Sequence, residues 1–71
     1  MCLAKVYTGD SERDLHGEPL MSEVARIECQ EGAVEITDLM GRTKFVKGEI
    51  QFIDFLGSVV GLRVTGLEDN G

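Results

Sequence analysis

The chain has 71 residues, of which 13 are acidic and seven are basic, so its net charge is −6 at pH 7. A chain of this length forms one small domain that buries roughly 60% of its unfolded surface, and pairing with a second copy commonly stabilises such domains. The acidic charge argues against nucleic acid as a partner. The chain contains neither the ~20-residue apolar run of a membrane helix nor the apolar segment of a secretory signal. We therefore expect a cytoplasmic protein.

The first seven residues carry the main candidate site, because Cys2 directly follows the initiator Met1. Residues 3–7 are apolar apart from Lys5 and are typical of a first strand, which would hold the cysteine at a fixed place. A thiolate beside a backbone nitrogen and an α-amino group can chelate one metal ion. A tetragonal set of nitrogen and sulfur donors suits Ni(II) or Cu(II), whereas closed tetrahedral sites favour zinc. Cys2 is thus a candidate metal ligand, the alternative being a small apolar side chain packed against the domain.

Residues 8–19 contain two glycines, the only proline and many charges, which predicts a loop longer than most connections. Such a loop is either a solvated excursion or functional. It includes His16, the only histidine. Imidazole is a good nickel ligand, but a single histidine in a charged loop is more often simply solvated.

Residues 24–30 predict a strand with one buried face, because Ala25, Ile27 and Cys29 alternate with two charged residues. Free cysteine is among the most buried residue types. We therefore expect Cys29 to lie in the core rather than to bind metal. Met21 and Met40 are likewise expected to be packing residues and not thioether ligands.

Glu31-Gly32 is typical of a two-residue hairpin turn. Residues 33–39 then alternate with Val34 and Ile36 facing inward, and residues 43–47 predict a fourth strand.

Gly48 is expected to form a bulge or a bend. The following segment, residues 50–55, is too rich in apolar side chains for a strand with one buried face, so strand curvature or a partner subunit must cover it. Residues 58–64 form the last expected strand.

The whole is an all-β meander of five or six short strands, with one domain over residues 1–66 and a flexible acidic tail at 67–71. Closure into a small antiparallel β-barrel, SH3-like or OB-like, would protect the sheet edges, and so would pairing in a homodimer.

The only basic cluster is formed by Arg42, Lys44 and Lys47, with Phe45 between them. A strand of this kind could contact RNA, because aromatic side chains stack on bases, or it could contact a protein partner. The alternative is ordinary polar decoration of an exposed strand, which the acidic net charge favours.

The sequence contains no arrangement of residues typical of an enzyme active site. A nucleophile with its base, a phosphate-binding loop and a carboxylate pair are all missing. Asp54 is flanked by apolar residues and is expected to be partly buried, with Arg63 or Lys47 as its partner. We therefore expect a protein that is not an enzyme.

The opening Met-Cys-Leu-Ala-Lys-Val resembles that of the CooT family, small nickel-binding proteins that accompany carbon monoxide dehydrogenase maturation. The likeness continues in the segments 18–21, 31–32 and 48–55. The first four residues are also similar to those of the hydrogenase chaperone HypC, whose second-position cysteine serves iron delivery. Chains of that type continue into a proline-glycine step, whereas residues 5–7 here read Lys-Val-Tyr, which favours CooT.

The resemblance implies a homodimeric β-barrel that binds one nickel ion per dimer through Cys2 of both chains. It also implies an accessory protein that stores, delivers or senses nickel for an enzyme such as carbon monoxide dehydrogenase, with that enzyme or its maturation proteins as further partners. Each chain would supply one thiolate and one nitrogen. The nitrogen is either the backbone amide of Cys2 or the free amine left when Met1 is removed.

Overall fold

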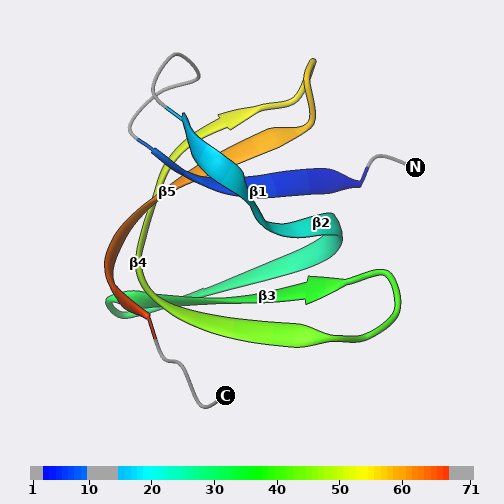
Figure 1. Cartoon of the computed structure of the whole chain (residues 1–71). Helices are drawn as coiled ribbons and strands as arrows, with labels where there is room; N and C mark the ends of the chain where they lie inside the picture. Colours follow the sequence, from blue (N-terminus) through cyan, green and yellow to red (C-terminus); the bar gives the residue numbers. More distant parts are fainter. Residues whose placement is uncertain (1–2, 10–14, 68–71) are drawn as a thin grey trace.

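The computed structural model describes residues 3–9 and 15–67, which form five strands and no helix. The strands are β1 (Ala4–Gly9), β2 (Leu15–Gln30), β3 (Ala33–Asp38), β4 (Thr43–Asp54) and β5 (Val59–Leu67). They close into a barrel in chain order, with β5 returning beside β1 (Figure 1). The prediction of a small all-β barrel is confirmed.

Four of the five strand pairs are antiparallel, and the pair of β1 with β5 is parallel. This follows from the number of strands. When successive strands reverse direction and an odd number closes a ring, the first and last strands run the same way. The start of β1 therefore lies beside the start of β5, where Lys5 is opposite Val59 and its N–H donates to the carbonyl of Ser58 at 3.0 Å.

Two long strands curve around the barrel, and each has an irregularity at its bend. In β2, Glu23 has a φ of 55° and the register to β3 shifts directly after Val24. In β4, the register to β5 shifts between Lys47 and Gly48, so the predicted bulge at Gly48 is confirmed. Figure 1 shows β4 curving so that the turns at its two ends and the start of β1 lie on the same side of the view.

The core contains mostly β-branched residues, which pack well on a pleated surface. Its fully or nearly fully buried members are Val6, Val24, Val34, Ile36, Val46, Val60 and Leu62. Val34 and Ile36 face inward as predicted, and the two-residue turn before them has its positive φ at Gly32. Met21 packs partly buried against this core, again as predicted.

Three sequence expectations are wrong. The connection after the first strand is shorter than expected, because β1 reaches Gly9 and β2 starts at Leu15. Cys29 is exposed, although it lies opposite the buried Val34, because the end of β2 has a described neighbour only on the β3 side. Met40 is 73% exposed in the turn after β3.

The segment at residues 50–55 divides into two parts. Ile50 and Phe52 are half-buried, but Ile53 and Phe55 are exposed. Strand curvature therefore covers only the first part within one chain. The strand β5 continues to Leu67, the first residue of the expected tail, and residues 68–71 lie outside the described part of the chain.

Candidate functional site

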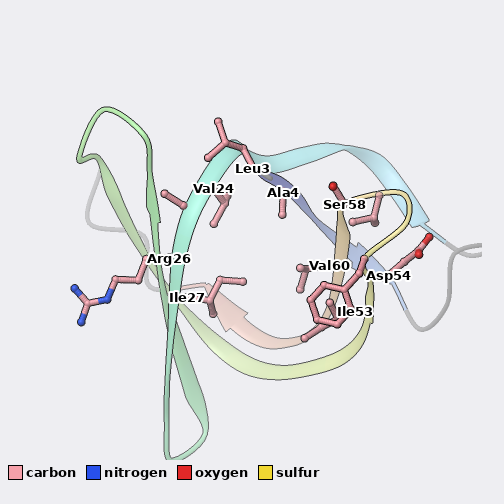
Figure 2. A pocket seen from close by; sticks show the side chains of 12 residues that line it. Leu3, Ala4, Val24, Arg26, Ile27, Ile53, Asp54, Ser58 and Val60 are labelled. Atoms are coloured by element: carbon pink, nitrogen blue, oxygen red, sulfur yellow. The ribbon is translucent and has the colours of Figure 1, made fainter. Parts of the chain in front are cut away.

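An apolar cavity of about 380 Å³ opens at the side of the barrel where β1 begins. Figure 2 shows that Ala4, Val24, Ile27 and Val60 point into it, whereas the charged ends of Arg26 and Asp54 point away. Its lining comes from four segments, namely Leu3-Ala4, Val24–Ile27, Ile53–Phe55 and Ser58–Val60. This volume lies within the range of small-molecule pockets.

The cavity lies where the described pairing of β1 with β2 ends. Ala4 lies opposite Val24, and no described residue pairs with β2 beyond that point on the β1 side. The remainder of β2, from Arg26 to Gln30, pairs only with β3 in the described part of the chain. The cavity lies between this stretch and the end of β4.

The predicted metal ligand, Cys2, lies outside the described residues. Its neighbour Leu3 is half-buried and lines the cavity. In the sequence, Cys2 directly precedes this cavity-lining residue.

The other candidate ligands do not gather at this opening within one chain. His16 pairs with Thr8, four residues along β1 from Ala4, which corresponds to about 13 Å at the rise of a strand. Cys29 lies two residues beyond Ile27, near the turn between β2 and β3. The described residues contain no group of three His, Cys, Asp or Glu side chains that could hold a metal ion.

Exposed apolar side chains continue the cavity onto the surface. Ile53 is 46% exposed, Phe55 82% and Leu56 fully exposed, all in the end of β4 and the turn that follows it. Apolar residues grouped in this way mark interaction sites more often than isolated ones do. We call Ile53, Phe55 and Leu56 the Phe55 cluster. The cavity could not be predicted from spacing along the chain, whereas the first two members of the cluster belong to the apolar segment 50–55 for which the sequence predicted additional cover.

Asp54 is half-buried as expected, and its Oδ1 accepts a hydrogen bond of 3.0 Å from the N–H of Leu56. This bond shapes the turn that carries the Phe55 cluster. The register places Arg63 opposite Glu49, not opposite Asp54, which pairs with Val59.

Asp38 fixes the turn between β3 and β4. Its Oδ1 accepts hydrogen bonds of 2.9 Å from the N–H groups of Met40 and Arg42, and its Oδ2 lies 2.9 Å from Nε of Arg42. Burial raises the pKa of Asp38, but the backbone donors and the guanidinium of Arg42 outweigh it and hold the pKa below its usual value. The carboxylate is the one buried charged side chain among the described residues.

The basic residues do not form one surface. Lys44 lies opposite the buried Ile36, and its Nζ donates to the carbonyl of Leu20 at 3.3 Å. Phe45 and Lys47 alternate with it and lie on the other face of β4. Arg42 is held by Asp38. This arrangement separates the residues that an RNA-binding strand would need together.

The described part of the chain contains no helix with the length and apolar character needed to cross a membrane. No curated protein and no solved structure matches the chain. A family model described as CO dehydrogenase accessory protein CooT matches residues 1–63, nearly the whole sequence. The chain therefore belongs to the CooT family of CO dehydrogenase accessory proteins.

Proposed function

We propose that this protein is a cytoplasmic nickel-binding accessory protein that uses Cys2 to store, deliver or sense Ni(II) for a nickel enzyme such as CO dehydrogenase. It acts without catalysis, through the folded unit of residues 1–66. The observation that carries the proposal is the position of Leu3. This residue lines an apolar cavity at the barrel opening and directly follows Cys2 in the sequence.

The metal is shared by two chains in this proposal. Each Cys2 gives a thiolate and an adjacent nitrogen, and together they form a planar set of two nitrogen and two sulfur donors that suits Ni(II). Such a set has two-fold symmetry, as has the contact in a C2 dimer. The Phe55 cluster beside the cavity supports a second chain at this opening, since these apolar side chains are exposed in one chain alone.

The apolar lining has a chemical consequence for the bound ion. Side chains such as Leu3, Val24 and Ile27 limit the access of water to a metal held at the opening. A hydrophobic shell of this kind controls solvent access and the local dielectric constant around a metal site.

The test is a titration of the purified protein with Ni(II), followed by ultraviolet-visible absorption. We expect thiolate-to-nickel charge-transfer bands that saturate at one metal per two chains. Cys2→Ser should lose these bands while keeping the fold and the oligomeric state. Cys29→Ser is the matched control, because Cys29 is exposed and lies on another element, and it should bind nickel like the unmodified protein.

Two results would change the proposal. Saturation at one metal per chain would keep nickel binding but reject the shared site. Bands that persist in Cys2→Ser would reject Cys2 as the ligand. The second candidate function, an RNA or protein contact through Arg42, Lys44 and Lys47, has less support, because these side chains are divided between two faces and one is held by Asp38.

A further inference from the structure

We infer that Ser58 is a positioning residue for nickel binding, because its left-handed backbone conformation directs its carbonyl group to the N–H of Lys5 and so anchors the start of β1 beside the cavity. The inference rests on the proposed function, and it gives a role to a residue that is not a proposed ligand. Ser58 acts through the backbone of β1 and not through its own hydroxyl group.

Ser58 has an unusual backbone conformation for its residue type. Its φ is 55°, in the left-handed region, and among the described residues Glu23 is the only other one besides glycines with a positive φ. A residue with a side chain adopts this conformation at an energetic cost. Such residues persist where the surrounding structure requires them, and they are frequent at functional sites. The contacts of Ser58 are therefore the place to look for what its conformation does.

The contact that stands out is with the first strand. The carbonyl of Ser58 accepts a hydrogen bond of 3.0 Å from the N–H of Lys5. Ser58 directly precedes Val59, the first residue of β5, and Val59 lies opposite Lys5 in the parallel pairing. The left-handed residue thus ends the turn after β4 and supplies a hydrogen bond at the start of the pairing between β1 and β5.

The turn that leads to Ser58 is itself held in place. The Oδ1 of Asp54 accepts a hydrogen bond of 3.0 Å from the N–H of Leu56. Gly57 lies close to the same carboxylate, since a Cβ atom built on it would come within 2.9 Å of Oδ2 of Asp54. Ser58 therefore connects β1 to a turn with a defined path.

The anchored stretch of β1 is the one that borders the cavity. Leu3 and Ala4 line the cavity together with Ser58 (Figure 2), and Lys5 follows them in the chain. On the β2 side, the register shifts directly after Ala4, whereas the pairing with β5 runs without a shift from Lys5 onward. The β5 side, which begins beside Ser58, therefore gives the start of β1 its regular support.

This support bears on nickel binding because Cys2 directly precedes Leu3 in the sequence. When the backbone near a binding site is already ordered, less conformational entropy is lost on binding and the affinity is higher. The hydrogen bond to Ser58 limits the backbone freedom of Lys5. Loosening this anchor should weaken nickel binding without removing any proposed ligand.

The experiment separates the backbone conformation of Ser58 from its side chain. Ser58→Gly removes the side chain but accepts a positive φ freely, and Ser58→Asn carries a side chain that tolerates it. Both should bind nickel like the unmodified protein. Ser58→Val introduces a β-branched residue, for which a positive φ is strongly disfavoured. Its nickel dissociation constant, measured by competition with a chelator of known affinity, should rise about tenfold.

Hydrogen exchange measured by NMR without metal tests the anchor itself. In Ser58→Val, the amide of Lys5 should exchange about tenfold faster than in the unmodified protein, because the start of β1 opens more easily. In Ser58→Gly and Ser58→Asn the exchange of this amide should remain close to that of the unmodified protein.

The matched control is Gly41→Val, which places the same β-branched residue at another left-handed position. Gly41 has a φ of 87° and open space around it. It lies in the turn between β3 and β4, whereas β1 pairs with β2 and β5. This variant should lower the free energy of unfolding but leave the nickel dissociation constant and the exchange of the Lys5 amide unchanged.

An equal loss of nickel affinity in Ser58→Val and Gly41→Val would overturn the inference, because general destabilisation would then explain both. Weak binding by Ser58→Gly would overturn it as well, since the side chain would be responsible. So would an unchanged exchange of the Lys5 amide in Ser58→Val.

The Cys2→Ser titration keeps this inference apart from the proposed function. If nickel binds the unmodified protein, is lost in Cys2→Ser and binds Ser58→Val normally, the proposed function stands and only the role of Ser58 is rejected. If the unmodified protein does not bind nickel, both are rejected.

Discussion

The aromatic ring of Phe52 lies directly over Gly61, its antiparallel partner on β5. A Cβ atom built on Gly61 would overlap three carbons of the ring, and Gly61 is buried beneath it. An aromatic side chain that covers a glycine on the neighbouring strand protects the backbone there and fixes the register. This contact lies where the end of β4 pairs with the start of β5. These two segments together form one wall of the cavity.

Gly61→Ala should therefore destabilise the barrel by about 1–2 kcal/mol, because the added methyl group displaces the Phe52 ring from a packed position. Chemical denaturation at constant pH measures the change. In a Phe52→Ala background, Gly61→Ala should lower the free energy of unfolding by clearly less, because the ring that obstructs residue 61 is absent. Equal costs in both backgrounds would show that the ring does not restrict residue 61.

Gly48→Ala should lower the free energy of unfolding by more than Gly61→Ala does, about 2–3 kcal/mol. A Cβ atom here would meet the carbonyl oxygen of Arg63 and come within 3.0 Å of Cα of Val64. These are backbone atoms of the paired strand, so no side-chain rotation relieves the contact. Gly41→Ala is the comparison, because Gly41 has open space around it and only its φ of 87° opposes a side chain, at about 1–2 kcal/mol for an L-residue. Chemical denaturation should therefore give Gly48→Ala a lower free energy of unfolding than Gly41→Ala, and the reverse order would contradict the prediction.

Acid should weaken the fold through Asp38. Its pKa is lowered in the folded state from the ordinary 3.8, so its contribution is present above about pH 4 and is lost as the pH falls through the folded value. Asp38→Asn keeps an oxygen acceptor for the two N–H groups but removes the ion pair with Arg42. We expect a lower free energy of unfolding at pH 7 and a smaller loss between pH 5 and pH 3 than in the unmodified protein. Urea denaturation at a series of pH values measures both.

Nickel affinity should rise with pH, because the ligands lose protons on binding. A free thiol has a pKa of about 8.5 and a free α-amine one of about 7.7–8.0, and a backbone amide also loses its proton when it binds a metal. Two thiols and two nitrogens therefore release four protons, and the apparent affinity should increase about ten-thousandfold per pH unit between pH 6 and 7. An increase of about a hundredfold would indicate that only two ionisable donors bind the ion. Competition with a chelator of known affinity at each pH gives the slope.

Local patterns in the sequence predicted the parts of the fold that depend on neighbours in the chain. The alternation around Val34 and Ile36, the turn at Gly32 and the bulge at Gly48 are all found where expected. Alternation shows which residues share a face, but it does not show whether another element covers that face. Cys29 illustrates this, since it shares a strand face with Ile27, which packs against the core, and is nevertheless exposed at the end of β2, where the described residues provide a neighbour only on the β3 side.

The candidate site could be predicted only in part. The position of Cys2 after Met1 suggested a metal ligand, but the cavity that Leu3 lines lies where the described pairing of β1 with β2 ends. That point is set by a register between segments about 20 residues apart. In the described part of the chain, the bend at Glu23 and the end of the β1–β2 pairing at Val24 lie beside the opening, and neither leaves a repeating pattern in the sequence.

The parallel pairing of β1 with β5 joins the two ends of the folded chain, since Lys5 lies opposite Val59. During synthesis β1 leaves the ribosome first and β5 last. The wall that fixes Leu3 and Ala4 at the cavity is therefore incomplete until nearly the whole domain has been made. Under the proposed function, a nascent or truncated chain would carry Cys2 without the completed wall beside Leu3, and the fold would restrict nickel loading to finished molecules.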